Sequence, residues 1–236
     1  MKNKNILIFG KGSYIGTKFQ EYLKDYNEYK IDVLDSMDEN WKKTDFSKYD
    51  VIYHVAGIAH VSSDPKMEKI YYKVNRDLPI EVAKKAKNEN VKQFIFMSSM
   101  IIYGVDGKIG KKKIIDENTE KLPIDFYGKS KLEADESIQK LETEKFKTVI
   151  IRTPMVYGPG CKGNFPKLKK IAKISPIFPN IDNERSMIYI DNLCEFLKQV
   201  IDKENTGIFY PQNKEYVSTK CIIKTMAKSM NKKYFL

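Results

Sequence analysis

The sequence predicts an α/β fold in which helices cover both faces of a parallel sheet. Short segments that are apolar almost throughout alternate along the chain with longer segments whose apolar residues recur every three or four positions. Near-continuous apolar strands are typical of parallel sheets, because helices cover both faces of such sheets. The alternation of the two kinds of segment indicates repeated strand–helix–strand units, which build a doubly wound sheet.

The elements of this sheet are expected before Pro154. Each strand is a short apolar run, and each helix has apolar residues near one face, as Ile15, Phe19 and Leu23 are in the first helix. In chain order we expect a strand at 5–10, a helix at 14–26, strands at 29–36 and 49–57, a helix at 66–88, a strand at 91–99, a helix at 126–141 and a strand at 146–154.

Beyond Pro154 the alternation weakens. The segment 156–180 is rich in Gly, Pro and Lys, so we expect it to leave the sheet for a smaller lobe. A strand leading into a helix is expected at 186–202, a short strand at 207–212, and a helix at 218–230 that Ser218 or Thr219 caps. The predicted division is a main domain at 1–160, to which 186–212 return, and a small C-terminal lobe made of 161–185 and 213–236.

The charge of the chain does not indicate a nucleic-acid partner. The net charge of +11 comes almost entirely from lysine, since arginine occurs only at positions 76, 152 and 185. Nucleic-acid binders concentrate positive charge and use arginine forks for phosphates. Here the lysines are spread over predicted helices and loops with glutamates between them, so we expect a solvated surface.

The composition also argues against a metal site, a disulfide framework and a membrane span. The three cysteines are widely spaced and only two histidines are present. No apolar run approaches the length that spans a bilayer. The apolar stretch near the N-terminus ends at a glycine-rich turn and is interpreted as a first strand, not a signal peptide. A cytoplasmic protein is therefore expected.

A glycine-rich loop, "IFGKGSYIG", lies between the first strand and the first helix. Gly10, Gly12 and Gly16 allow a tight turn, a close approach of the backbone to a pyrophosphate, and packing of the helix on the strand. The helix N-terminus would then face the phosphates. The alternative is an ordinary strand–helix turn, and the residues that follow favour the dinucleotide site.

Asp35 ends the second strand, 25 residues after Gly10. An acidic side chain near this position hydrogen-bonds the ribose 2′-hydroxyl of a dinucleotide. No arginine stands near Asp35 to receive a 2′-phosphate, which favours NAD over NADP. An aspartate in a polar loop is the alternative, because Asp32 and Asp38 are its neighbours.

Two further segments have the residue types expected beside a dinucleotide. Asp45 and Phe46 follow the second strand, where a carboxylate and an aromatic ring could flank an adenine. Ala56 and Gly57 end the third strand with small residues, as expected where the backbone passes close to a cofactor. His54 lies within that apolar strand and is interpreted as a core or near-cofactor histidine rather than a metal ligand.

A serine pair and a tyrosine–lysine pair are the candidate catalytic residues. Ser98 and Ser99 end a buried strand, and ligands bind at the carboxyl ends of strands in open α/β sheets. Tyr127 and Lys131 are four residues apart and share one face of the next helix. The ammonium and the positive helix end should both favour the phenolate, so Tyr127 could remove a proton from a sugar hydroxyl.

Together these segments resemble a known family. The motifs "ILIFGKGSYIG", "DVIYHVAGIAHV", "FIFMSSMIIYG", "YGKSK" and "IIRTPMVYGPG" occur in the order seen in the extended short-chain dehydrogenases/reductases. The chain is similar in particular to the NAD-dependent epimerase/dehydratase group, close to UDP-glucose (UDP-galactose) 4-epimerases. The resemblance covers essentially the whole chain and implies a Rossmann-type sheet with a small C-terminal substrate-binding lobe.

The resemblance implies roles for individual residues. The implied catalytic set is Ser99, Tyr127 and Lys131, with Ser99 preferred over Ser98 because it stands four residues before Tyr103. The expected NAD-binding residues are Gly10, Gly12, Ser13, Tyr14, Ile15, Gly16, Asp35, Asp45, Phe46, Ala56, Gly57, Asn75, Ser98, Tyr127, Lys131 and Pro154. The expected residues for a UDP-sugar are Ser99, Tyr103, Asn164 and Arg185, the last as a fork for a phosphate.

Two departures from the family pattern bear on function. Ser13 stands where the family usually has a glycine, so the turn is expected to be slightly rebuilt. Members commonly continue past the last helix seen here, so we expect either a truncated chain or a compact member with a more open sugar pocket. The family often pairs through helices that include the tyrosine–lysine helix, which leaves a homodimer open.

The expected activity is NAD-dependent 4-epimerisation of a UDP-sugar, by transient oxidation at C4 and return of the hydride. A 4,6-dehydratase needs further acid–base groups beside the serine, and Met100 and Ile101 follow Ser99 instead. A 4-keto-sugar reductase needs the same three residues and stays open, although Asp35 disfavours NADPH. A cofactor-binding protein without turnover is the remaining alternative.

Overall fold

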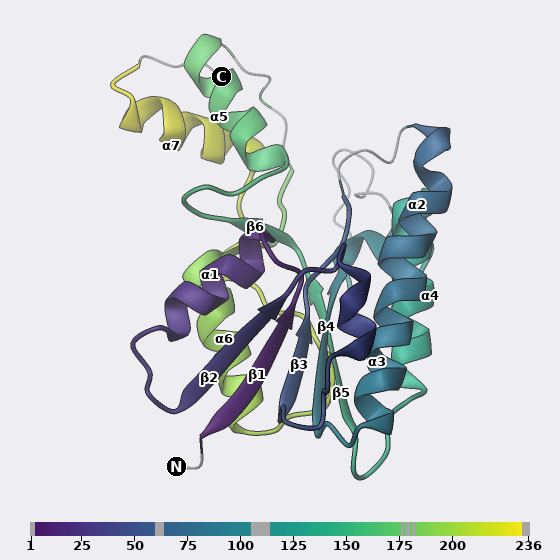
Figure 1. The fold of residues 1–236 in the computed structure, drawn as a ribbon. Coiled ribbons are helices and arrows are strands. Elements are labelled where there is room, and N and C mark those ends of the chain that lie inside the picture. Colours follow the sequence, from purple (N-terminus) through teal and green to yellow (C-terminus); the bar gives the residue numbers. More distant parts are fainter. Residues whose placement is uncertain are drawn as a thin grey trace.

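The computed structural model describes residues 3–59, 64–104, 114–175, 177, 180 and 183–232. Its main feature is a six-stranded sheet in which all paired strands are parallel, as the apolar runs predicted (Figure 1). The strands are β1 (Lys4–Phe9), β2 (Tyr29–Leu34), β3 (Val51–His54), β4 (Gln93–Ser99), β5 (Lys147–Thr153) and β8 (Gly207–Phe209).

The order of the strands creates a switch point beside β1. The sheet runs β2-β1-β3-β4-β5-β8, so the chain first builds outward on one side of β1 and then continues on the other. In open sheets of this kind, ligands bind where the order reverses, outside the carboxyl ends of the strands. The site is therefore expected above the ends of β1 and β3, where Phe9 pairs with His54.

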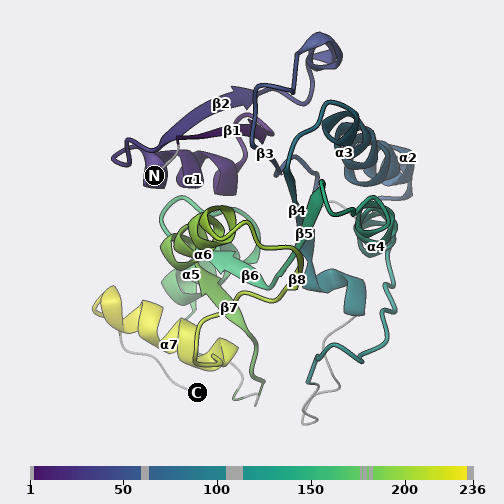
Figure 2. The same ribbon diagram turned by 90° about the horizontal axis from the view of Figure 1, so that it is seen from below.

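Helices cover both faces of the sheet (Figure 2). On one face, α1 (Tyr14–Leu23) and α6 (Ile190–Asp202) contact each other and bury Ile6, Ile8 and Tyr53. On the other face, α3 (Leu78–Asn88) and α4 (Phe126–Gln139) bury Phe9 and Phe94. Alternate residues of β1 thus enter opposite halves of the core, because successive side chains of a strand point to opposite faces.

The helix expected at 66–88 is built from four consecutive pieces. They are a 3₁₀ turn (Pro65–Met67), α2 (Glu68–Tyr72), a π-helical turn (Lys73–Asp77) and α3. Further 3₁₀ turns lie at Glu39–Lys43 and Met100–Tyr103. None of the helices in the described ranges is long and apolar enough to cross a membrane.

A smaller lobe lies beyond the carboxyl edge of the sheet (Figure 1). β6 (Met155–Tyr157) and β7 (Met187–Tyr189) form a separate parallel pair, and α5 (Asn164–Ile174) contacts α7 (Thr219–Ser229). Between these parts the chain returns to the main sheet, since β8 pairs with β5. No regular element had been expected at 156–180, but β6 and α5 lie there.

Candidate active site

The glycine-rich loop forms a cradle above β1. Gly10 has φ +134° and Gly12 has φ +75°, conformations that side-chain-bearing residues rarely adopt. A Cβ at Gly10 would lie 2.6 Å from the backbone nitrogen of Ala56, so the loop and the end of β3 are in close contact. These two glycines are required by the turn itself.

Ser13 replaces the usual glycine by capping α1. Its φ of −67° and ψ of 140° are ordinary for any residue, and its Oγ accepts a hydrogen bond from the Gly16 backbone N–H at 3.2 Å. A Cβ at Gly16 would lie 2.5 Å from that Oγ. Tyr14 and Ile15 then begin the helix, which directs its free N–H groups to the cradle. Loop and helix end therefore fit a pyrophosphate.

Asp35 lies beside this cradle. The backbone N–H groups of Gly10 and Lys11 both donate to the carbonyl of Leu34 at 3.0 Å, which joins the loop to the end of β2. Asp35 follows Leu34, is half-buried, and accepts a hydrogen bond from the Met37 N–H at 2.9 Å. Its position next to the cradle is compatible with the ribose contact expected from the sequence.

The ring of Phe46 does not lie where the sequence suggested. The residue is 0% exposed, its ring stacks on Trp41 with centroids 6.4 Å apart, and the Lys85 ammonium lies 4.9 Å from its centroid. The ring is therefore part of the core and cannot flank an adenine, and the Phe46 backbone N–H donates to the Glu89 carboxylate. Asp45 is exposed and bonds the Ser47 hydroxyl at 2.6 Å.

Asn75 fixes the segment that follows β3. Within the π-helical turn it is completely buried, and its amide accepts from the Ile58 N–H and donates to the Ile58 carbonyl, both at 2.9 Å. A Cβ at Gly57 would lie 3.0 Å from Asn75 Oδ1 and 3.4 Å from Lys131 Nζ. Gly57, Asn75 and Lys131 thus meet at the switch point, with Ala56 buried against the loop of β1.

The structure brings Ser99 and Tyr127 together. Ser99 ends β4, where its Oγ accepts from the Ile101 N–H at 3.3 Å, and its side chain is near enough to the Tyr127 phenol to lower the pKa of that phenol. Tyr127 stands in the first turn of α4, which the Asp125 carboxylate caps by accepting from the Gly128 N–H at 2.8 Å. The cap fixes where the helix begins, and so where the phenol points.

Tyr127 and Lys131 differ electrostatically from the sequence-based expectation. Burial raises the pKa of Tyr127 to about 12, the Ser99 side chain opposes the rise, and Tyr71 and Asp125 add to it. The Lys131 ammonium donates to the Met97 carbonyl at 2.8 Å instead of lowering the phenol pKa. The expected phenolate is therefore not favoured here, and Tyr127 is a neutral phenol at neutral pH.

Lys131 itself has an unusual environment. It is 5% exposed, and its ammonium lies 4.7 Å from the centroid of the Phe96 ring. Burial lowers its pKa to about 8, and the Asp135 carboxylate opposes this by raising it. The residue is thus close to the balance between its charged and neutral forms in the physiological range.

Ser98 and Tyr103, which were expected to contact the cofactor and the sugar, instead belong to a buried hydrogen-bond network. Ser98 is 3% exposed and its hydroxyl donates to Asp135 at 2.7 Å, so its side chain is not available to a cofactor. Tyr103 is 2% exposed, and its hydroxyl accepts from Arg152 Nη1 at 2.7 Å and shares a 2.8 Å hydrogen bond with Tyr210. The expectation that the Tyr103 side chain contacts the sugar is therefore wrong for this structure.

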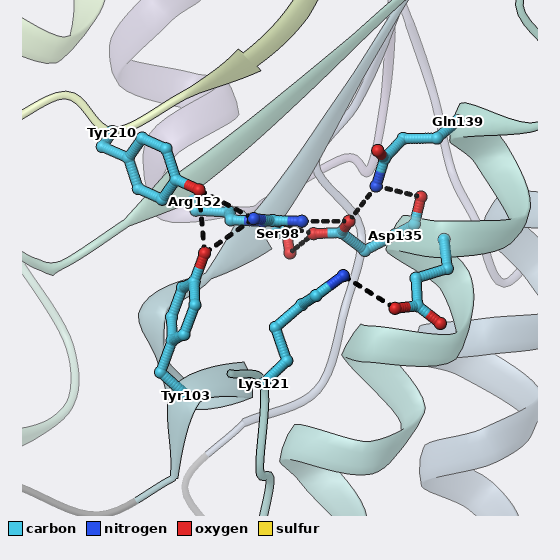
Figure 3. A network of polar contacts seen from close by, with 8 residues as sticks. Ser98, Tyr103, Lys121, Asp135, Gln139, Arg152 and Tyr210 are labelled. Atoms are coloured by element: carbon cyan, nitrogen blue, oxygen red, sulfur yellow. Dashed lines mark hydrogen bonds and ion pairs between the residues drawn. The ribbon is translucent and has the colours of Figure 1, made fainter. Parts of the chain in front are cut away.

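Arg152 is the centre of this network, which the sequence did not predict (Figure 3). Its Nε and Nη2 donate to the two carboxylate oxygens of Asp135 at 3.0 and 2.9 Å, and its Nη1 also donates to Tyr210 at 2.8 Å. Gln139 donates to the same carboxylate at 2.6 Å. The scarcity of arginine in a lysine-rich chain was the one available signal that Arg152 needs its fork.

The remaining candidates are at the lobe and in the core. Pro154 is half-buried directly after β5, Asn164 is exposed at the start of α5, and the backbone of Arg185 pairs with Val217 at 3.1 Å. His54 is completely buried and stacks on Phe9, and no hydrogen bond reaches either ring nitrogen from the described residues. Burial, followed by the Lys131 charge, lowers its pKa to about 3, so it is a neutral core histidine.

Known proteins are similar to this chain in sequence. The sequence pattern of the NAD dependent epimerase/dehydratase family matches residues 6–217. A UDP-glucose 4-epimerase of Vibrio cholerae is 30% identical over 253 residues, which covers 97% of this chain and 76% of that protein. An N-acetyl-alpha-D-glucosaminyl-diphospho-ditrans,octacis-undecaprenol 4-epimerase of Escherichia coli O157:H7 is 28% identical over 253 residues, which covers 98% of this chain and 74% of that protein.

Solved structures agree in fold. A dTDP-4-dehydrorhamnose reductase of Clostridium acetobutylicum superposes with a TM-score of 0.82 at 22% identity, covering 98% of this chain and 82% of the other. A UDP-glucuronic acid 4-epimerase of Bacillus cereus in complex with NAD gives 0.81 at 22% identity, covering 98% and 84%. The glycine cradle fits the cofactor in the family's name. The chain belongs to the NAD dependent epimerase/dehydratase family.

Proposed function

We propose that the protein is a NAD-dependent nucleotide-sugar 4-epimerase of the UDP-glucose/UDP-galactose type. The observation that carries this proposal is the meeting of Ser99, Tyr127 and Lys131 at the switch point, next to the glycine cradle. The similarity to a UDP-glucose 4-epimerase supports the substrate class. Reductases occur among the structural relatives as well, so the reaction has to be tested against reduction.

The proposed chemistry divides between cofactor and protein. Bound NAD supplies a hydride acceptor and donor for the sugar C4. Tyr127 takes the proton of the 4-hydroxyl and gives it back, while the Ser99 hydroxyl orients that oxygen. Because Tyr127 is a neutral phenol in this structure, its action as a base requires a contact with the Lys131 ammonium that replaces the hydrogen bond of Lys131 to Met97.

The small lobe supports an anionic substrate. α5 and α7 together contain seven lysines and no aspartate or glutamate. This differs from the sequence-based expectation that glutamates lie between the lysines. Both helices belong to the lobe beyond the carboxyl edge of the sheet (Figure 1). A cationic surface near the site attracts a diphosphate by long-range electrostatics. Asn164, at the start of α5, and Arg185 are the proposed contacts.

The proposal is tested by incubating the protein with NAD and a panel of UDP-sugars and resolving the products by chromatography. Interconversion of a pair of C4 epimers without net change of the cofactor supports it. Consumption of reduced cofactor with a 4-keto sugar indicates a reductase instead. Tight NAD binding with no change in any sugar indicates a binding protein, and either of the last two results overturns the proposal.

The proposed role of Asp35 makes cofactor preference a testable property. NAD should bind about tenfold more tightly than NADP, because a carboxylate accepts from a ribose hydroxyl but repels a 2′-phosphate. Asp35→Asn should reduce this preference, while Asp38→Asn, beyond the end of β2, should keep it. Isothermal titration with both cofactors measures the preference. A clear preference for NADP in the unaltered protein would contradict the assignment.

The proposed role of Arg185 predicts a selective loss of substrate affinity. Arg185→Lys keeps the charge but removes the fork that binds a phosphate at two points, so UDP should bind about tenfold more weakly. NAD affinity should be unchanged. Titration of the variant with each ligand separates the two effects. Equal losses for UDP and NAD would mean that Arg185 acts on the structure of the lobe rather than on the phosphate.

A further inference from the structure

A carboxylate that no part of the proposed reaction uses lies one helical turn beyond Lys131. Asp135 is on the same face of α4 as Lys131, since residues four apart on a helix are neighbours, and it is 0% exposed. Ser98, which donates to this carboxylate, directly follows Met97, whose carbonyl receives the Lys131 ammonium. The same end of β4 therefore holds both the ammonium and the carboxylate.

The partners of Asp135 come from three separate elements. Arg152 reaches it from β5, Ser98 from β4 and Gln139 from the next turn of α4 (Figure 3). Ser98 and Arg152 are register partners across the two strands. The carboxylate thus has hydrogen bonds on both oxygens, which fixes its position against the sheet.

Burying the Asp135–Arg152 ion pair costs free energy, so a structural contact alone is a weak reason for it. Removing two charges from water is costly, and apolar residues of similar volume often fill such sites equally well. A fixed carboxylate beside a buried ammonium has an effect that apolar residues cannot supply, because it stabilises the charged form of that amine.

The charged and titratable groups around Lys131 come from every element packed against it. Asp135 and Tyr127 are on α4, Arg152 is on β5 behind Asp135, and the neutral His54 is on β3. Asn75, from the π-helical turn, is polar but uncharged. Asp135 is the one carboxylate among these described residues, so the charged state of Lys131 depends on it.

We propose that Asp135, held in place by Arg152, is a positioning residue that keeps the buried Lys131 side chain charged. The inference deepens the proposed function, since it concerns a residue of that same site. It assigns to the Asp135–Arg152 pair a role in the state of the catalytic lysine, beyond joining α4 to the sheet.

The proposal is tested by NMR titration of protein whose lysines carry ¹³C at Cε. Lys131 is assigned by the signal missing in Lys131→Met, and its midpoint near 8 should separate it from exposed lysines near ~10.4. In Asp135→Asn the midpoint should fall by about one pH unit. Glu136→Gln removes the adjacent carboxylate, which pairs with Lys121 at 2.8 Å, and should leave the midpoint unchanged.

A double variant guards against misfolding. Asp135→Asn leaves the Arg152 guanidinium buried without its counter-ion, whereas Asp135→Asn with Arg152→Gln replaces the pair by two neutral amides. The double variant should also show a lowered Lys131 midpoint, but by less than Asp135→Asn, because it removes the opposing Arg152 charge as well. A Lys131 midpoint in either folded variant equal to that of Glu136→Gln would overturn the proposal and leave the pair a structural contact.

Activity supplies a second readout that separates this proposal from the proposed function. If the protein is an epimerase, the alkaline limb of its kcat–pH profile should move to lower pH in Asp135→Asn, together with the Lys131 midpoint. A lowered midpoint in a protein that epimerises no sugar would refute the proposed function alone. An unchanged midpoint in an active epimerase would refute the role of Asp135 alone.

Discussion

Replacing Tyr127 with phenylalanine should lower turnover on the order of 10³-fold while the protein still folds and binds NAD. The hydroxyl is the group that would exchange a proton with the sugar, and the Ser99 side chain is near enough to lower its pKa. The fold should persist, because the variant loses one hydrogen bond, worth about 1 kcal/mol, and keeps the ring contact with Tyr71 at 5.7 Å. Single-turnover kinetics and NAD titration measure the two properties.

A matched control for this variant is available on the neighbouring helix. Tyr72→Phe also removes one hydroxyl from a half-buried helical tyrosine, whose ring has Arg76 at 4.6 Å. It should leave turnover at the level of the unaltered protein. Comparable turnover in Tyr127→Phe and Tyr72→Phe would remove Tyr127 from the reaction.

Replacing Arg152 with methionine should lower the free energy of unfolding by about 3–5 kcal/mol. The change leaves the Asp135 carboxylate buried without its counter-ion, and the hydroxyls of Tyr103 and Tyr210 lose their shared donor. Since domains of this size are stable by only about 5–15 kcal/mol, a large part of the stability would be lost. Urea unfolding followed by circular dichroism gives the difference.

Arg76 provides the comparison for a surface pair. It contacts Asp77 at 2.7 Å and Glu133 at 2.9 Å, distances close to those of the Arg152–Asp135 pair, but all three side chains are substantially exposed. Arg76→Met should cost less than about 1 kcal/mol, because solvent screens exposed pairs. Equal losses for Arg76→Met and Arg152→Met would show that burial does not determine the cost.

The sheet could be predicted from the sequence because its strands are apolar on both sides. Elements within it were located to within a few residues, as for β4, expected at 91–99 and observed at Gln93–Ser99. α5 was missed because Gly and Pro surround a weakly apolar segment. Its inward positions, Phe165, Leu168 and Ala172, have helical spacing, but lysines occupy half of the others.

The candidate site was predictable where order along the chain carries information. The glycine cradle, Ser99, Tyr127 and Lys131 follow strand ends and helix starts, which meet at one edge of a parallel sheet. The directions of single side chains were not predictable in the same way. Ser98 and Ser99 are adjacent on β4, yet the Ser98 hydroxyl donates to Asp135 while the Ser99 side chain acts on the pKa of Tyr127. The partners of Arg152 come from distant segments, and no local pattern connects them.

The return of the chain to the sheet has a consequence for the order in which the protein is made. α6 covers the face that contains Ile6, Ile8 and Tyr53, but it is translated only after the lobe segment with α5. Until Asp202 has left the ribosome, that apolar face has no complete cover. Nascent chains that stall before this point would expose a surface of the kind that chaperones bind, so the late position of α6 makes folding of the main domain depend on synthesis as far as Asp202.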